Sequence, residues 1–230
     1  MQVNEVHPQG WISFGLQSSE QPSILLKRSM NFPNLLTLSR IPLMLLVIGL
    51  LYPDPSTTWP GLRSLALFLF LFAALTDWLD GWLARKFGQV SEFGKFMDAL
   101  ADKVLTMGMF VSLLALGALE KWTLFLILLI LSREFLITGL RLVASAKGKT
   151  LAAEKVGKIK TVVQLLCISL FLGQLAMEVD GYRFLDSTTN LQVIETLRWA
   201  GQLSLIFATV LTVFSGIIYL VKYWKYFLDK

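Results

Sequence analysis

Runs of apolar residues long enough to cross a lipid bilayer dominate this chain. A helix needs roughly 20 residues to cross the hydrocarbon core, and six stretches of the sequence come close to that length or exceed it. We place these helices at about 34–52, 62–86, 95–118, 122–146, 156–177 and 200–224. Only 16% of the 230 residues are charged, whereas a soluble domain usually carries about a quarter. The sequence therefore predicts an all-α integral membrane protein with six transmembrane helices.

The segments outside these helices suggest one membrane domain with an extension. Residues 1–30 contain no uninterrupted apolar core followed by a cleavage site, so we do not interpret them as a secretory signal. We expect them to form an N-terminal cytosolic extension, and residues 31–230 to form the six-helix domain. Segment 178–198 is rich in polar residues, and we expect it to be a loop before the last helix.

Lysine and arginine residues are distributed unevenly along the chain. An even number of membrane crossings puts both termini on one side, and all but four of the 21 basic residues fall on that side. The four exceptions are Arg63, Lys121, Arg183 and Arg198. Because basic residues concentrate in cytoplasmic loops, we predict that both termini are cytoplasmic. The absence of a transit-like leader favours a bacterial inner membrane.

The composition also excludes several kinds of function. The net charge of +5 indicates anionic lipids or anionic substrates, and since no RNA-binding signature or zinc-finger spacing accompanies it, we expect no nucleic-acid partner. Cys167 is the only cysteine, so an intramolecular disulfide is impossible. His7 is the only histidine and lies in the polar N-terminal segment, which argues against a catalytic or metal-binding histidine.

Four aspartates lie at the facing ends of the second and third predicted helices. Asp77 and Asp80 are three residues apart, and Asp98 and Asp102 are four apart, so each pair shares one helix face. An ionised carboxylate in a membrane is costly, and four close together would repel one another without positive charge between them. Hard oxygen ligands suit Mg²⁺ or Mn²⁺, and four shared carboxylates can hold two such ions about 4 Å apart. We therefore predict a two-metal site at the cytoplasmic end of the protein.

Two other interpretations of these aspartates stay open. They can be solvated acids at helix ends, at the membrane interface. They can also form the acidic site of a divalent-cation transporter or channel, although transporters usually bind their ions near the bilayer midplane. Gly81 and Gly94 lie on or beside the acidic face, where glycine allows either a flat ligand or a neighbouring helix to approach closely.

Together these residues form one spaced pattern. It reads Asp77-x2-Asp80-Gly81-x2-Ala84-Arg85-x8-Gly94-x3-Asp98-x3-Asp102. With every fixed position filled, the pattern resembles the signature of the CDP-alcohol phosphotransferase family, and the resemblance covers about residues 31–225. Ala99 follows Asp98 where many relatives have proline, so we expect a straighter helix start and no lost chemistry.

The resemblance implies a role for each residue of the pattern. Asp77, Asp80 and Asp98 would hold the two ions that bind the pyrophosphate of CDP-diacylglycerol. Asp102 would complete the second metal site and act as the base that accepts the proton of the acceptor hydroxyl. Residues with smaller side chains would make room for cytidine and ribose, and Arg85 would contact phosphate. The expected CDP-lipid site comprises Thr37, Asp77, Asp80, Gly81, Ala84, Arg85, Gly94 and Asp98.

Three further segments are similar to those of family members whose acceptor is sn-glycerol 3-phosphate and whose product is phosphatidylglycerol phosphate. They are Asn34-x2-Thr37-x2-Arg40, Ser132-Arg133-Glu134-Phe135 with Gly139-Leu140-Arg141, and Gly157-Lys158-Ile159-Lys160-Thr161. Arg133 and Arg141 are eight residues apart, which places them within about 80° of each other around a helix. Lys158 and Lys160 begin the next helix at the same membrane face, so we expect these four residues to bind the acceptor phosphate.

The acceptor stays open among several alternatives. Basic residues at this face can also serve orientation in the membrane or bind lipid headgroups, and Arg133 can simply pair with Glu134 or with a motif carboxylate. An enzyme that uses serine, inositol or choline would need less fixed positive charge. One that uses inositol phosphate would need a similar amount, and one that uses phosphatidylglycerol would need a pocket open to lipid.

We assign Tyr219 and Tyr223 to anchoring at the inner membrane boundary. The family resemblance suggests a homodimer, embedded among membrane lipids.

Overall fold

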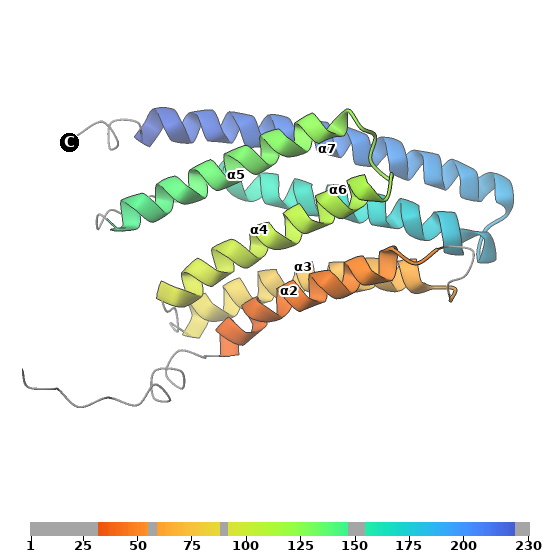
Figure 1. The fold of residues 1–230 in the computed structure, drawn as a ribbon, viewed down its shortest axis with the longest axis horizontal. Helices are drawn as coiled ribbons and strands as arrows, with labels where there is room; N and C mark the ends of the chain where they lie inside the picture. The colour runs from red at the N-terminus through yellow and green to blue at the C-terminus, as the bar shows by residue number, and fades with distance from the viewer. Residues whose placement is uncertain (1–31, 55–58, 88–91, 147–154, 224–230) are drawn as a thin grey trace, which may run out of the picture.

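The part of the chain that the structure describes is a bundle of long helices (Figure 1). The computed structural model describes residues 32–54, 59–87, 92–146 and 155–223, and gives only the backbone of 32–38, 77–87, 92–99, 102, 146, 155 and 156. Its elements are α2 (Phe32–Leu51), α3 (Leu62–Phe87), α4 (Glu92–Ala115), α5 (Thr123–Ala146), α6 (Lys155–Asp180), the short 3-10 helix η1 (Gly181–Arg183) and α7 (Ser187–Tyr223). Each long helix lies where the sequence predicted one, and these ranges contain no strand. The all-α prediction is confirmed for this part of the chain.

Two groups of helices make up the bundle. The first three helices form one group, in which α2 packs against both α3 and α4. In the other group α7 packs against α6 and α5, and α6 also packs against α3, so contacts between α3 and α6 join the two groups (Figure 1). Because consecutive helices run in opposite directions, the end of α3, the start of α4, the end of α5 and the start of α6 all lie toward one end of the bundle.

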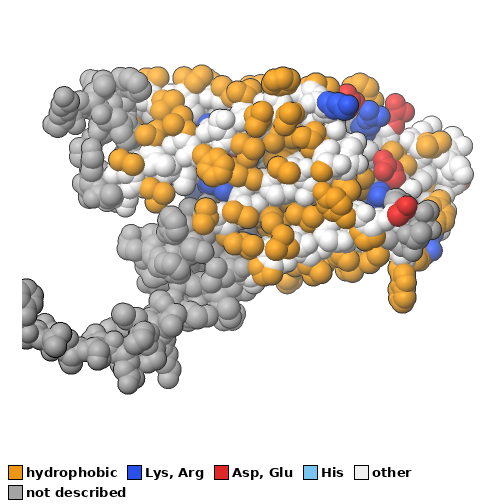
Figure 2. Space-filling view, viewed as in Figure 1, with side chains coloured by type: hydrophobic (Ala, Val, Ile, Leu, Met, Phe, Trp, Pro, Cys, Tyr) orange, Lys and Arg blue, Asp and Glu red, His pale blue; other side chains and the backbone are white. Residues whose placement is uncertain are grey.

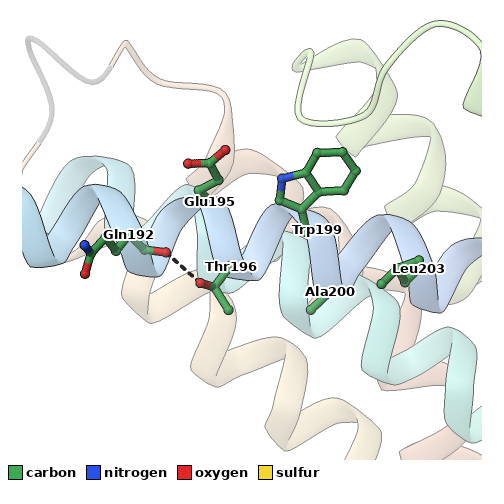
Figure 3. Close-up of a pocket in the computed structure, with 6 residues that line it drawn as sticks. All are labelled: Gln192, Glu195, Thr196, Trp199, Ala200 and Leu203. Carbon is green, nitrogen blue, oxygen red and sulfur yellow. Dashed lines mark hydrogen bonds between the residues drawn. The ribbon is translucent and has the colours of Figure 1, made fainter.

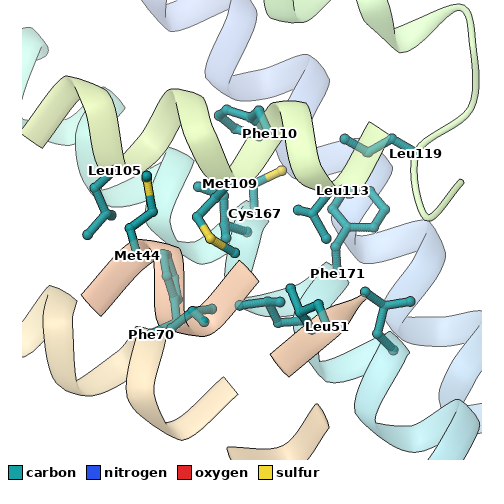
Figure 4. Close-up of a cluster of buried hydrophobic side chains, with 14 of the residues drawn as sticks. Met44, Leu51, Phe70, Leu105, Met109, Phe110, Leu113, Leu119, Cys167 and Phe171 are labelled. Carbon is teal, nitrogen blue, oxygen red and sulfur yellow. The ribbon is translucent and has the colours of Figure 1, made fainter. Parts of the chain in front are cut away.

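The core is apolar and closely packed. Buried side chains from α2, α3, α4 and α6 meet there, among them Met44, Phe70, Met109 and Phe171 (Figure 4). Small residues bring the helices together: a Cβ at Gly201 of α7 would lie 2.9 Å from the ring of Phe171 on α6. Tight approach through glycine is a common way for membrane helices to associate, because lipid provides little hydrophobic driving force between them.

The outer surface suits a membrane. Within the described residues, three helical segments are long and apolar enough to cross a bilayer: Thr123–Ser145, Gly157–Arg183 and Ser187–Tyr223. The parts of α2, α3 and α4 whose side chains are described form shorter apolar segments. Figure 2 shows hydrophobic side chains over the middle of the visible face, and charged side chains gathered toward one end. The chain therefore has the helices and the surface of a membrane protein.

The predicted loop at 178–198 is wrong. Helix α6 continues to Asp180, and α7 already begins at Ser187. Asp186 caps α7: its Oδ2 accepts a hydrogen bond from the Thr189 N–H at 3.1 Å, and its hydrogen bonds to Thr189 hold the pKa of this carboxyl below its usual value. The polar residues that suggested a loop therefore include a helix cap and the buried Asp180 and Asn190, which lie at the end of α6 and in the first turn of α7.

A second carboxylate ties α6 to the start of α3. Asp180 is 4% exposed; its Oδ1 accepts the Gly61 N–H at 2.7 Å, and its Oδ2 accepts the Ser64 hydroxyl at 2.6 Å and the Ser64 N–H at 3.2 Å. The Gly61 N–H immediately precedes α3 and the Ser64 N–H lies in its first turn. N–H groups at the start of a helix have no partner within that helix. Asp180 thus serves as an N-cap supplied by a different helix.

We predict that Asp180→Ala lowers the free energy of unfolding by about 2 kcal/mol, because it removes the cap and leaves the half-buried Ser64 hydroxyl without its acceptor. Thermal unfolding in detergent micelles measures the effect. Glu195→Ala on the exposed surface of α7 is the control and should change little. An unfolding temperature equal to that of the wild type would show that the cap contributes nothing.

Candidate active site

The four aspartates of the pattern lie toward one end of the bundle, where α3 ends and α4 begins (Figure 1). Asp77 and Asp80 belong to the last turns of α3, and Asp98 and Asp102 to the first half of α4. Both segments are helical, so the spacings of three and four residues do put each pair on one helix face. The side chains of all four aspartates lie outside the described part, and their predicted meeting stays a prediction.

The other residues expected to bind the CDP-lipid share this position. The side chains of Thr37, Gly81, Ala84, Arg85 and Gly94 also lie outside the described part, although their backbone is helical. Among the described side chains, no group of three or more histidines, cysteines or acids could hold a metal ion. The metal prediction therefore rests entirely on the four aspartates, whose oxygen donors fit Mg²⁺ or Mn²⁺.

A buried ionic cluster lies beside this region. Glu134 of α5 is 7% exposed and accepts a hydrogen bond from Lys160 of α6. Its carboxylate oxygens also lie 3.8 Å from Nζ of Lys103 on α4 and 3.6 Å from the guanidinium of Arg133. We call these four residues the Glu134 cluster. It joins three helices, holds three cations around one anion, and includes the residue next to Asp102 in sequence.

The two lysines at the start of α6 face different surroundings. Lys158 and Lys160 are two residues apart and therefore about 200° apart around the helix. Lys160 is 5% exposed and holds Glu134, whereas Lys158 is exposed. The sequence placed both in the acceptor site, but the structure brings only Lys160 into the Glu134 cluster.

Arg133 and Arg141, the two arginines of α5, both contact α7. Gly216 of α7 lies so close to Arg133 that a Cβ there would be 2.8 Å from Cγ of the arginine. Nε of Arg141 lies 3.4 Å from the hydroxyl of Tyr219, and its guanidinium lies 5.3 Å from the centre of the Tyr219 ring. Both predicted acceptor ligands on α5 therefore face the last helix.

The anchoring role assigned to Tyr219 is wrong. This tyrosine is 1% exposed and packs against Tyr223 with a distance of 4.6 Å between ring centroids. Tyr223 is also buried, at 8% exposed, so neither ring lies at the membrane surface of the bundle. The aromatic pair fills the space between α5 and α7, because Ile137 and Leu140 of α5 pack against it.

Comparison with known proteins identifies the family. Residues 30–214 match the family model of CDP-alcohol phosphatidyltransferases. The chain belongs to this family. It is 37% identical to the CDP-diacylglycerol–glycerol-3-phosphate 3-phosphatidyltransferase of Bacillus subtilis (strain 168), over 85% of this chain and 96% of the relative. The enzyme of the same name from Rickettsia felis is 32% identical over 86% of this chain and 97% of the relative. An Arabidopsis thaliana enzyme named as the second such transferase is 29% identical over 91% of this chain and 86% of the relative.

The sequence assigned no substrate-binding role to several residues near the candidate site of this CDP-alcohol phosphatidyltransferase. They are Arg40, Lys103, Gly216 and Tyr219. Arg40 is 2% exposed in the middle of α2, and a buried charge inside an apolar helix is costly enough to mark it as a candidate. The same signal was available for Glu134, the only acid within the predicted helix 122–146.

A hollow on the surface lies far from this site. Its lining residues all belong to α7: Gln192, Glu195, Thr196, Trp199, Ala200 and Leu203 (Figure 3). The hydroxyl of Thr196 donates to the Gln192 carbonyl at 2.7 Å and so has its partner within the helix. Along α7, Thr196 lies 20 residues, or about 30 Å, from Gly216. This hollow is no part of the candidate active site.

Proposed function

We propose that this enzyme transfers the phosphatidyl group of CDP-diacylglycerol to sn-glycerol 3-phosphate, giving phosphatidylglycerol phosphate and CMP. Family membership and the names of its relatives support the reaction. The observation that carries the choice of acceptor is the surplus of positive charge in the Glu134 cluster, three cations around one carboxylate. Such a surplus suits an acceptor that already carries a phosphate, because charge-assisted hydrogen bonds are the strongest that proteins make.

The donor side of the site uses the residues of the family pattern. Asp77, Asp80, Asp98 and Asp102 would hold two Mg²⁺ or Mn²⁺ ions, which would supply positive charge for binding the pyrophosphate and for stabilising CMP as it leaves. Asp102 accepts the proton of the acceptor hydroxyl, which attacks the β-phosphorus of the CDP-lipid. Thr37 and Arg85 contact the donor, and Gly81, Ala84 and Gly94 leave room for the nucleoside. Positioning and charge stabilisation provide most of what phosphoryl transfer requires.

On the acceptor side, some basic residues bind the acceptor directly and others only add positive charge. Arg141 and Lys158 bind the phosphate of the acceptor, and Arg133 adds to the positive potential from within the Glu134 cluster. Lys160 contributes its charge from a buried position, where Glu134 fixes its ammonium group. Since Glu134 also pairs with Lys103, which follows Asp102, this carboxylate links the acceptor side to the helix of the proposed base.

The membrane arrangement follows from the helix lengths. Helices α2, α3 and α4 have 20, 26 and 24 residues, enough to cross the hydrocarbon core. We therefore infer six transmembrane helices, with residues 31–230 as the membrane domain and 1–30 as a cytosolic extension. From the positive-inside distribution we infer that the active site and both termini are cytoplasmic. The bacterial relatives support a location in a bacterial inner membrane, and the family resemblance suggests a homodimer.

The function is tested by CMP release from CDP-diacylglycerol by the purified protein with Mg²⁺. Glycerol 3-phosphate, serine, inositol, inositol phosphate and phosphatidylglycerol are supplied as separate acceptors. We expect release with glycerol 3-phosphate alone. Release with a different acceptor would keep the metal chemistry and overturn the assignment of the basic residues. No release with any of them, combined with movement of divalent ions into liposomes, would favour a transporter.

We predict that Lys158→Gln raises the KM for glycerol 3-phosphate about tenfold, because a hydrogen bond between charged groups contributes about 1.5–3 kcal/mol. The KM for CDP-diacylglycerol should stay within about twofold, since that substrate is held elsewhere. Steady-state kinetics with each substrate varied in turn measure both values. Lys121→Gln, at the other end of the bundle, is the matched control. Equal changes in both KM values would remove Lys158 from the acceptor site.

A further inference from the structure

The last turns of α7 contact both arginines of the proposed acceptor site, although the match to the family model ends at residue 214. Gly216 meets Arg133 and Tyr219 meets Arg141. The two α7 residues are three positions apart, so they share one face of the helix. Thr212, one turn earlier on this face, receives a hydrogen bond from Gln164 of α6 at 3.3 Å. This face of α7 is therefore turned inward, toward α5 and α6, over its last three turns.

Gly216 leaves room for the side chain of Arg133. A Cβ at this position would lie 2.8 Å from Cγ, 3.4 Å from Nε and 3.7 Å from Cδ of the arginine. Cγ is near the root of the side chain, so a small movement of the guanidinium cannot relieve the clash. Alanine at position 216 would force Arg133 into a different rotamer and shift it relative to Glu134, whose carboxylate lies 3.6 Å away.

Tyr219 orients Arg141 through two parts of its side chain. Its hydroxyl lies 3.4 Å from Nε, and its ring lies under the guanidinium at 5.3 Å. The tyrosine is itself fixed, because it is buried and packs against Ile137 and Tyr223. Both contacts leave the terminal nitrogens of Arg141 available for other hydrogen bonds, as binding of a phosphate by this residue would need.

We propose that Gly216 and Tyr219 are positioning residues that hold Arg133 and Arg141 for the acceptor phosphate and so set the affinity for the acceptor. The inference rests on the proposed function. Neither residue touches the substrate: Gly216 acts by the absence of a side chain, and Tyr219 by a fixed hydroxyl and ring. Because both act on the acceptor side, their loss changes the KM for glycerol 3-phosphate and leaves the handling of CDP-diacylglycerol unchanged.

The test is steady-state kinetics of the full-length protein in detergent, with each substrate varied in turn. Gly216→Ala should raise the KM for glycerol 3-phosphate about tenfold, the value of one lost charged hydrogen bond. Tyr219→Leu, which loses ring and hydroxyl, should have a similar effect, and Tyr219→Phe, which keeps the ring, should recover most of the affinity. The controls are Gly49→Ala, where a Cβ meets nothing within 4 Å, and the exposed Tyr182→Phe.

The possible outcomes distinguish failure of this inference from failure of the proposed function on which it rests. A wild type that releases CMP with glycerol 3-phosphate, together with a selective rise in the KM for that substrate, supports the inference. Unchanged KM values, or equal changes for both substrates in both the Gly216 and the Tyr219 variants, would overturn it and leave the proposed function intact. If Gly216→Ala does not fold, the Tyr219→Leu and Tyr219→Phe pair decides. A wild type inactive with glycerol 3-phosphate would remove the proposed function and this inference together.

Discussion

Asp98→Asn is expected to reduce CMP release at least about a thousandfold while leaving the protein folded in the membrane. The substitution keeps the size of the side chain and removes its negative charge. Divalent ions in a site built from carboxylates provide several kcal/mol of charge stabilisation, and each 1.36 kcal/mol changes the rate tenfold. Measurements of CMP release at a fixed amount of purified, monodisperse protein give the effect.

A matched control distinguishes loss of chemistry from loss of structure. Asp186→Asn makes the same change at the cap of α7, where asparagine is an equally good N-cap, and should retain nearly full activity. Because fewer charges at the metal site weaken metal binding, we also expect Asp98→Asn to need more Mg²⁺ for its residual activity. If Asp98→Asn turns over at the wild-type rate, the two-metal assignment is wrong.

The helices could be predicted from the sequence because lipid imposes a minimum length on every apolar span. The predicted helix at 122–146 and the observed α5, Thr123–Ala146, differ by a single residue at one end. The prediction was wrong at 178–198, because polarity alone does not distinguish a loop from polar turns at the ends of two long helices. Asp186 is a residue type that commonly caps the start of a helix, but the polar residues around it are equally typical of a loop.

The sequence predicted those parts of the site that depend on residue spacing along one helix. It did not predict those parts that depend on contacts between different helices. The intervals from Asp77 to Asp80 and from Asp98 to Asp102 fix a shared face as soon as each segment is helical. Nothing local to Tyr219 shows that it meets Arg141, which lies 78 residues earlier, and a tyrosine near a helix end fits a membrane anchor equally well. Lys103 and Lys160 likewise reach Glu134 from α4 and α6, so only the packed bundle reveals them, whereas the adjacent Arg133 was a partner that the sequence already offered.

Glu134→Gln is expected to destabilise the protein by about 3–5 kcal/mol, since removing one partner of a buried ion pair leaves the other charge uncompensated. Here three cations share that anion, and Lys160 is almost fully buried. Less folded protein than for the wild type should survive extraction into detergent, and the protein that survives should unfold at a lower temperature. Lys160→Met alone should also destabilise the protein, but less, because Lys103 and Arg133 still face the remaining carboxylate.

The double variant Glu134→Gln/Lys160→Met decides whether the pair is coupled. It removes both members of the closest contact, so it should be less destabilised than the sum of the single variants by at least about 1 kcal/mol. Thermal unfolding of the wild type, the two single variants and the double variant in the same detergent completes the double-mutant cycle, and additive effects would show that the two residues act independently.

Steady-state kinetics of the folded double variant then distinguish two possible roles of Lys160. An unchanged KM for glycerol 3-phosphate would mean that this lysine serves only Glu134, whereas a raised KM with the fold restored would mean that its charge also attracts the acceptor.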